Sequence, residues 1–471
     1  MTALGRTPGE VCAEVLALVR RRLGPGAEAE VTAWWGRSAL TRFANSHIHQ
    51  NVADDHLGAR LRLALDGRVV TASTGRLAGG GLERLVATAA EIAGLGRPDP
   101  GWPGVAPASP VPDAAHHDEA TATAEPHRRA EVAAAFIAAG ASPVAGAPGA
   151  SAAAGAAGAA GGGAVRATEA AGFCSTGGGA VAFANTAGHE AGGAWSGAEV
   201  SGVHRLPGAD GGAGRTALAL GDLDGAAVGA EAADRARRGI EPVELAPGSY
   251  EVILLPSAVA DVVGFLGHGF NARRHAEGTS HVELGATQLD PAITLVDDAG
   301  DRRSLGVGFD AEGTPRRRLE LVRRGVSVAL AHDRRTAAAA GTASTGHAVP
   351  GGEASGPEPG HLLLEPGPTS LEAMIATVER GLLVTDLWYT RVLDPKTQVV
   401  TGLTRNGTFL VEAGRLGPGV ANLRFTQSYV EALAPGNVLA VGGHGRLAGE
   451  RPSWVPALHL GSWRFTGGAA G

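Results

Sequence analysis

A tract from Ala141 to Ala164, made almost wholly of alanine, glycine, serine and proline, sets the strongest limit on how this chain can fold. Side chains of this kind cannot bury enough apolar surface to offset the conformational entropy that is lost on ordering. The tract is therefore predicted to be a disordered surface insertion without an active role. The packed parts of the protein must come from the segments before and after it.

The chain of 471 residues is too long for one compact core, so two or three domains are expected. Three segments are predicted: an N-terminal α+β domain over 1–112, a central α+β segment over 113–240 that contains the insertion, and a β-rich C-terminal domain over 241–471. The predicted fold class is α+β, with N-terminal mixed α/β domains followed by a curved or barrel-like C-terminal sheet.

Hydrophobic periodicity predicts the elements of the first two segments. An amphipathic helix near the N-terminus places Val11, Val15, Leu16 and Leu18 on or near one face. Further helices are predicted over 82–95, 124–139 and 223–238. The predicted strands cover 29–35, 39–45, 57–65, 68–72, 180–185 and 192–203, and a linker rich in proline and glycine covers 96–112.

Two short sequences in these segments repeat each other. Phe43-Ala44-Asn45-Ser46 is followed by His49, and Phe183-Ala184-Asn185-Thr186 is followed by His189. Asn followed by Ser or Thr at the end of a strand suits a hairpin turn. The repeat indicates either two matching hairpins or a coincidence of biased composition, and it does not favour a catalytic role for either histidine.

The C-terminal segment is predicted to be mostly short strands separated by turns. A buried strand over 250–255 leads into a helix over 257–270, and a helix over 370–379 starts at Ser370, a residue type typical of helix caps. Further strands are predicted over 293–296, 326–331, 382–388, 398–403, 408–411 and 438–441.

Composition argues against several classes of protein. The formal charge of −7 argues against a nucleic-acid-binding surface as the main function. The two cysteines, Cys12 and Cys174, cannot build a disulfide framework or a paired-cysteine metal site, and they suit a reducing cytoplasm. No membrane span or secretory signal is expected, because the first apolar stretch follows acidic residues and ends in three arginines.

The segment from Val262 to His281 looks like a zinc-binding helix from which most of the chemistry has been removed. His268 occupies the position of a second histidine ligand. Val263 stands five residues earlier, where the first ligand would be, and Gly264 replaces a general-base glutamate. Zinc-dependent hydrolysis needs metal ligands and a base that takes a proton from the bound water. This segment offers one ligand and no base.

A rearranged metal site built from nearby residues is not favoured. His268 and His275 are seven residues apart, so in a continuous helix they would lie about 10 Å apart along the axis. Zinc–nitrogen bonds of about 2 Å cannot span that gap. His281 and Glu283 could approach only through a turn at Gly278. His268 is therefore interpreted as a packed or solvent-facing residue.

Two further groups carry candidate chemistry. Asp310 and Glu312 could form an acid–base pair, but Gly313 and Pro315 follow directly and favour a turn. The sequence Ser344-Thr345-Gly346-His347 could supply a nucleophile with a base, although the sequence identifies no third group to orient that base. This loop is interpreted as structural or substrate-lining.

From near Ala39 onward, the chain resembles the TldD/TldE (PmbA) family. The resemblance rests on an ordered series of motifs and not on one of them. The series comprises Thr41-Arg42-Phe43-Ala44-Asn45-Ser46, Gln50-Asn51, Gly278-Thr279-Ser280, Phe309-Asp310-Ala311-Glu312-Gly313-Thr314-Pro315, Gly325-Val326, His332-Asp333-Arg334-Arg335-Thr336-Ala337, Ser344-Thr345-Gly346-His347-Ala348, Trp388-Tyr389-Thr390-Arg391, Asp394-Pro395, Thr401-Gly402-Leu403-Thr404-Arg405-Asn406-Gly407-Thr408-Phe409, Asn422-Leu423-Arg424-Phe425 and Pro456-Ala457-Leu458.

The resemblance implies a cytoplasmic bacterial peptidase system that shortens or matures unfolded or modified peptides. Its TldD-like member binds zinc through a His-Glu-x-x-x-His motif and a late cysteine, and its TldE-like member lacks these ligands and pairs with TldD. Here the three motif positions are Val263, Gly264 and His268, and no cysteine follows Cys174. The chain is therefore similar to the TldE-like member.

The resulting hypothesis is a non-catalytic subunit without a cofactor of its own. It would pair with a TldD-like zinc peptidase and help to hold an extended peptide by strand addition. The residues expected to line the substrate or the partner are Thr279, Ser280, Asp310, Glu312, Gly313, Thr345 and His347. Two alternatives stay open: a divergent metallopeptidase active by itself, and a peptide-binding escort protein without peptidase activity.

Overall fold

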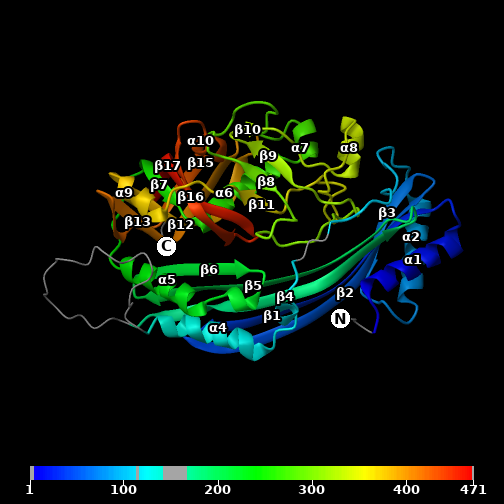
Figure 1. The fold of residues 1–471 in the computed structure, drawn as a ribbon, viewed down its shortest axis with the longest axis horizontal. Coiled ribbons are helices and arrows are strands. Elements are labelled where there is room, and N and C mark those ends of the chain that lie inside the picture. The colour runs from blue at the N-terminus through cyan, green and yellow to red at the C-terminus, as the bar shows by residue number, and fades with distance from the viewer. Residues whose placement is uncertain (1–4, 113–115, 142–166, 469–471) are drawn as a thin grey trace.

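Two sheets and the helices that cover them form the protein, seen in a computed structural model that describes residues 5–112, 116–141 and 167–468 (Figure 1). Apart from Ala141, the predicted insertion lies outside the described residues. The predicted α+β fold class is confirmed, because helices and strands alternate in the N-terminal half and strands dominate the C-terminal half.

The first sheet has six strands in the order β3-β2-β1-β4-β5-β6, and each neighbouring pair is antiparallel. The strands are β1 (Glu28–Ala44), β2 (His47–Leu65), β3 (Arg68–Thr74), β4 (Glu169–Asn185), β5 (Glu190–Leu206) and β6 (Ala209–Ala217). The two strands predicted over 29–35 and 39–45 are one strand, since Gly36 to Ser38 keep their pairing with both β2 and β4. The strand predicted to begin at Ala180 begins at Glu169, because the glycines before Ala180 are paired with β1 and β5.

Four helices cover one face of this sheet: α1 (Pro8–Leu23), α2 (Gly81–Leu95), α4 (Pro126–Ala139) and α5 (Gly225–Arg238). Two short elements, α3 (Glu119–Ala122) and η1 (Leu220–Asp222), complete this part of the chain. A capping box between Thr7 and Glu10 starts α1. The odd-numbered residues Val31 and Ala33 of β1 point into the core beneath α1 and α2, and Phe43 packs against Phe136 of α4.

The first sheet contains an internal repeat. The order α1-β1-β2-β3-α2 is followed by α4-β4-β5-β6-α5, and the Phe-Ala-Asn sequences that end β1 and β4 lie 140 residues apart (183 − 43). The hairpin interpretation is therefore confirmed. Each turn also bonds to the opposite half: Ser46 Oγ accepts a hydrogen bond from the Ala170 N–H, and Thr186 Oγ1 accepts one from the Ala29 N–H.

This sheet crosses the border that sequence analysis places between residues 112 and 113. β1 belongs to the segment 1–112 and β4 to the segment 113–240, yet the two strands pair continuously from Glu30↔Asn185 to Phe43↔Gly172. Composition separates the segments along the chain, whereas backbone hydrogen bonding joins them in one sheet.

The second sheet closes on itself. Its strands are β7 (Gly248–Leu254), β8 (Leu295–Asp297), β9 (Leu319–Arg323), β10 (Val326–Ser327), β11 (Leu362–Leu364), β12 (Arg380–Asp394), β13 (Val399–Glu412), β14 (Arg415–Gly419), β15 (Leu423–Ser428), β16 (Val438–Ala448) and β17 (Ser453–Gly468). The path β17-β15-β13-β12-β7 returns to β17 and forms a ring. The predicted curved or barrel-like sheet is confirmed.

Five helices accompany the second sheet: α6 (Pro256–Gly269), α7 (Ala272–Ala276), α8 (Arg334–Ala340), α9 (Leu371–Thr377) and α10 (Tyr429–Ala432). The predicted cap Ser370 accepts a hydrogen bond from the Ala373 N–H. The strand predicted over 326–331 is only the two residues of β10, and the two strands predicted over 398–411 are the single strand β13. In the described ranges, no helix has the length and apolar character needed to cross a membrane.

The C-terminal part lies over the face of the first sheet that is opposite to α1, α2, α4 and α5 (Figure 1). Even-numbered residues of β2 and odd-numbered residues of β4 point toward it. Arg62 reaches Glu312, and the Phe183 ring lies so close to Gly313 that a Cβ there would approach it to 2.3 Å. The loop around Asp310 is thus the junction between the two halves.

The hydrogen bonds of the repeat can be tested with Ser46→Ala and Thr186→Val. Each change leaves a backbone N–H of the other half without its side-chain acceptor, so each should lower the free energy of unfolding by about 1 kcal/mol. Ser73→Ala, at an exposed position of β3, is the control and should change it by less than about 0.5 kcal/mol. Urea unfolding measures the stability of all three variants. A loss of stability in Ser73→Ala equal to that in the two turn variants would contradict the role of the turns.

Candidate functional site

α6, the predicted degenerate zinc helix, is held inside the C-terminal core. Pro256 stands in its first turn, where no backbone N–H is required. Val259, Val263 and Leu266 are buried among the strands of the second sheet. The position of the lost first ligand is therefore occupied by a core side chain, with Val263 only 1% exposed.

The two glycines Gly264 and Gly267 of α6 have different surroundings. A Cβ at Gly264 would have no atom of another residue within 4 Å, whereas a Cβ at Gly267 would come within 2.6 Å of Leu362 Cδ1. The position of the lost general base thus faces open space. The fold leaves room for a Cβ at this position.

His268 stands in the last turn of α6, half-buried beside the Phe265 ring. Burial lowers its pKa, with the Glu358 carboxylate acting in the opposite direction. The helix ends at Gly269, so His275 lies in the separate helix α7. His281 is also buried, which lowers its pKa to about 4, and its Nδ1 lies 3.2 Å from Gln398 Nε2.

Among the described residues, the histidines around α6 are not grouped with further metal ligands. In the part of the chain that the structure describes, no three side chains of His, Cys, Asp or Glu are grouped so that they could hold a metal ion. A stable zinc site needs three or four such ligands at about 2.0–2.3 Å. The residues around α6 therefore do not fit zinc.

Thr279 and Ser280 lie just after α7 and use their hydroxyls locally. Ser280 Oγ donates to the Gly269 carbonyl at 2.6 Å, and Thr279 Oγ1 donates to the Arg274 carbonyl at 3.2 Å. Both hydroxyls bond carbonyls near helix ends, and the Arg274 carbonyl also accepts from the Thr279 N–H. The structure thus gives these two predicted site residues a role in holding the turns after α6 and α7.

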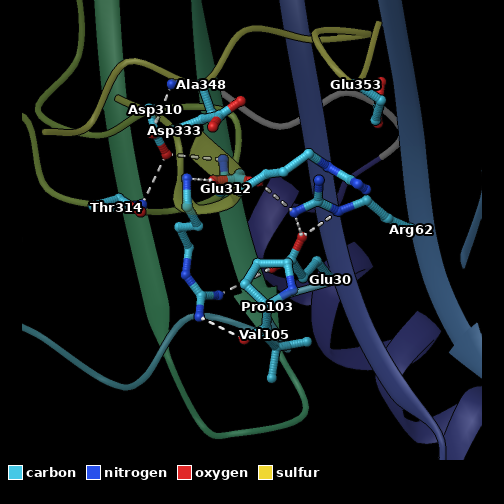
Figure 2. A network of polar contacts seen from close by, with 12 residues as sticks. Glu30, Arg62, Pro103, Val105, Asp310, Glu312, Thr314, Asp333, Ala348 and Glu353 are labelled. Atoms are coloured by element: carbon cyan, nitrogen blue, oxygen red, sulfur yellow. Dashed lines mark hydrogen bonds and ion pairs between the residues drawn. The ribbon is translucent and has the colours of Figure 1, made fainter. Parts of the chain in front are cut away.

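Asp310 and Glu312 lie at the junction of the two halves (Figure 2), and Gly313 beside them contacts Phe183 of the first sheet. Asp310 accepts hydrogen bonds from the backbone N–H groups of Glu312, Thr314 and Ala348, each at 2.9 Å. Burial raises the pKa of Asp310 to about 6, and the nearby Glu312 adds to this effect. The carboxylate fixes the loop, which agrees with the turn interpretation.

Arg62 joins this loop to the first sheet. Its Nε donates to Glu30 Oε2 of β1 at 2.6 Å, and its Nη2 donates to Glu312 Oε1 at 3.0 Å. Glu312 Oε2 also accepts from the Arg334 backbone N–H, and the Arg334 guanidinium donates to the Gly104 carbonyl. Burial raises the pKa of Glu30 to about 7 although Arg62 acts to lower it.

A cavity beside this network is small. It measures about 40 Å³ and is lined by Arg60 and Thr71 from the first sheet and by Asp333 and Gly352 from the C-terminal part, among others. That volume holds a few water molecules. Asp310 and Glu312 are buried, at 3% and 5% exposed, and their carboxylates bond to groups of the same chain.

Thr345, His347 and Asp297 form a relay. Thr345 Oγ1 lies 2.8 Å from His347 Nδ1, and His347 Nε2 lies 3.1 Å from Asp297 Oδ1. Although burial acts to raise it, the pKa of Asp297 is held well below its usual range by the His347 imidazole beside it. Asp297 is the orienting group that sequence analysis did not identify.

The relay lies mostly within the fold, since His347 is buried and Thr345 is half-buried. His347 is 0% exposed, and Thr345 Oγ1 already accepts from the His332 N–H at 2.7 Å and lies 3.1 Å from the His332 carbonyl. A catalytic nucleophile needs a free approach to its oxygen. The relay instead fixes the loop that supplies the Ala348 N–H to Asp310.

An exposed edge of β12 lies beside α6. β12 pairs with β7 only from Gly381 to Val384, and its later residues pair with β13 alone among the strands described. Thr390 Oγ1 donates to Asp261 Oδ2 of α6 at 2.6 Å, which fastens this edge to the helix. Trp388 and Tyr389 are 48% and 63% exposed there.

Sequence analysis did not identify Glu30, Arg62, Asp261 or Asp297, and it named Arg334 only as part of a family motif. Two of them had a readable signal, since Glu30 interrupts an apolar strand and Asp261 interrupts an apolar helix. A charge in such a position needs a partner, which implies a buried network. The identity of the partner depended on segments far apart in the chain.

Residues 247–467 match the family model of the PmbA/TldA metallopeptidase C-terminal domain. This part of the chain is therefore similar to the C-terminal domain of the PmbA/TldA metallopeptidases. A search of the curated proteins found no match.

Solved structures share the fold of nearly the whole chain. TldE from Thermococcus kodakarensis is similar with a TM-score of 0.82 and 19% identity over 96% of this chain and 99% of that one. A proposed DNA gyrase modulator from Thermotoga maritima is similar with a TM-score of 0.79 and 17% identity, over 98% of this chain and 100% of that chain. Another proposed gyrase modulator, from Bacteroides thetaiotaomicron, has a TM-score of 0.79 and 19% identity over 98% of each chain.

The structural role of Asp310 predicts a large effect of a small substitution. In Asp310→Asn, an NH₂ group would face one of the three backbone N–H donors, so the free energy of unfolding should fall by about 2 kcal/mol. Asp333→Asn is the matched control, because Asp333 caps α8 through one oxygen and asparagine caps helices equally well. Similar losses in thermal unfolding for both variants would contradict this role.

The two glycines of α6 predict opposite effects. Gly264→Ala should raise the free energy of unfolding by up to about 1 kcal/mol, because alanine favours helix and its Cβ meets open space. Gly267→Ala should lower it by about 1–3 kcal/mol, because its Cβ would overlap Leu362. Urea unfolding distinguishes the two, and a loss of stability for Gly264→Ala would show that this position is filled.

Proposed function

We propose that this chain is a non-catalytic, TldE-like subunit of a peptidase complex in which a TldD-like partner holds the zinc ion. The observation that carries the proposal is the composition of α6. The helix has the place of a zinc helix but offers Val263 and Gly264 where a ligand and a base are needed. The side chains around His268 do not supply replacements.

The surroundings of Gly264 indicate that the general base is absent for a reason other than steric crowding. Because a side chain would fit there, the absent carboxylate is not explained by crowding. A fold that keeps the helix, its core and its open side, but not the reacting groups, suits a subunit that contributes a wall of a shared chamber.

The edge of β12 supports a contribution to peptide binding. Beyond Val384, no strand among the described residues pairs with the edge of β12 that β7 occupies earlier, so an extended peptide could add there as a further strand. Trp388 and Tyr389 offer large exposed aromatic surfaces at that edge. Recognition through the backbone would accept unfolded peptides of many sequences.

Co-expression with a TldD-like protein tests the assembly. The two chains should co-purify, and the complex should hydrolyse unfolded peptides in a zinc-dependent manner. Changing the motif glutamate of the partner to glutamine should abolish hydrolysis, because that side chain would be the general base. Activity that survives this change, or stoichiometric zinc in this chain purified alone, would contradict the proposal and favour a metallopeptidase active by itself.

The aromatic edge has a separate test within the complex. Trp388→Ser with Tyr389→Ser should raise KM for an unfolded peptide by about tenfold and leave the complex assembled, because large aromatic contacts dominate such surfaces. Leu439→Ser, at an exposed position of β16, is the matched control and should leave KM unchanged. An unchanged KM in the double variant would remove β12 from the peptide site.

A further inference from the structure

A second cavity lies between the β5–β6 hairpin and the second sheet, where β13 lies against β6 (Figure 1). Its volume is about 330 Å³, which is within the range of roughly 300–1,000 Å³ that small-molecule sites occupy. The two halves approach closely beside it, since a Cβ at Gly419 would lie 2.7 Å from the Gly239 Cα. The residues that line this cavity are all different from those that line the cavity beside Arg62.

Two opposite charges line this cavity side by side without pairing. Arg205 of β5 and Asp210 of β6 are directly opposite each other in the antiparallel ladder, so their Cβ atoms lie about 5 Å apart on one face of the sheet. Among the described residues, neither side chain makes a hydrogen bond or an ion pair. Opposite charges in this position normally attract each other. Two that stay apart beside a cavity leave both free to bind a third group.

Asn422 supplies a further polar side chain to the same cavity. It lies shortly after β14, on the wall that faces the hairpin. Within the described ranges, its amide also makes no hydrogen bond. An amide group can donate to a carboxylate and accept from an ammonium group. Asn422 is therefore suited to either end of a molecule that carries both charges.

The rest of the wall is apolar or small. Leu206, Phe409 and Val420 line the cavity and are largely buried beneath it. The other small or apolar lining residues are Gly208, Ala209, Gly239, Pro242, Gly407, Gly419 and Ala421. Such a wall offers apolar contact and no further charge. It suits an aliphatic group that leaves water on binding.

The charges select the class of ligand. A simple anion would be repelled by Asp210 and a simple cation by Arg205, whereas a molecule with both charges on neighbouring atoms attracts both side chains. An α-amino acid carries its ammonium and carboxylate groups on one carbon. We propose that this cavity binds a free α-amino acid with an aliphatic side chain, with Arg205 on the carboxylate and Asp210 on the ammonium group. No residue of α6 or β12 lines the cavity, so the site is separate from the proposed peptide edge.

Calorimetric titration of this chain, purified alone, with L-leucine tests the site. L-Leucine should bind with a Kd of about 1 mM or tighter, which a ligand of this size can reach. N-Acetyl-L-leucine lacks the ammonium charge and L-leucinamide lacks the carboxylate. Each should bind about tenfold more weakly or worse, because one hydrogen-bonded charge is lost. No binding of L-leucine at about 10 mM, or equal binding of all three compounds, would overturn the proposal.

Two substitutions assign the two ends of the ligand. Arg205→Gln should weaken L-leucine to the level of L-leucinamide, and Asp210→Asn should weaken it to the level of N-acetyl-L-leucine. Arg21→Gln and Glu379→Gln, at exposed positions elsewhere, are the matched controls and should leave the affinity unchanged. Circular dichroism and thermal unfolding verify that each variant is folded. An affinity for L-leucine that survives either change would overturn the assignment. These outcomes are independent of whether a TldD-like protein binds.

Discussion

One guanidinium joins the two halves of this protein. Arg62 extends from the first sheet between the carboxylates of Glu30, on its own sheet, and Glu312, on the loop of the C-terminal part (Figure 2). A buried charge of this kind is costly unless each group keeps its partners. The network therefore tolerates few relative positions of the two halves. The close contact of Gly313 with Phe183 and the course of the Asp310 loop depend on that position.

The polar residues that sequence analysis named as candidates for catalysis hold the loops at the junction of the two halves. Asp310 collects three backbone N–H groups, and Asp297 orients His347, which in turn fixes Thr345. Each of these side chains would suit catalysis if it faced a cleft. Here their hydrogen-bond partners belong to the loops at the junction, so these side chains hold the junction in place. The open positions of the molecule lie elsewhere, at Gly264 and along β12.

The two repeated halves of the six-stranded sheet have the same fold, but their edges are covered differently. Ser46 and Thr186 make the same exchange of hydrogen bonds at opposite ends of the β1–β4 pair. The edges of the two halves are finished differently, because the chain crosses β5 at His116 but leaves β2 open. A repeated fold therefore does not give the two halves the same neighbours.

The sequence alone determined much of this protein. Periodicity located α1 and α6, the cap Ser370 located α9, and the motif positions Val263, Gly264 and His268 defined what α6 lacks. These properties are local, because they depend on residues a few positions apart. Strand lengths were predicted less well. Gly178 lies within β4 despite its weak strand preference, since α3 packs against it so closely that a Cβ would come within 2.4 Å of Ala122 Cβ.

Only the tertiary structure decided which polar groups meet. Glu30 and Glu312 are 282 residues apart (312 − 30) and share one arginine, and Asp297 and His347 meet across a loop. Nothing in the local sequence specifies these pairs, because the partners are set by how the two sheets stack. The deficit in α6 could be read from the chain, whereas the structural roles of Asp310, Glu312 and His347 required the folded molecule.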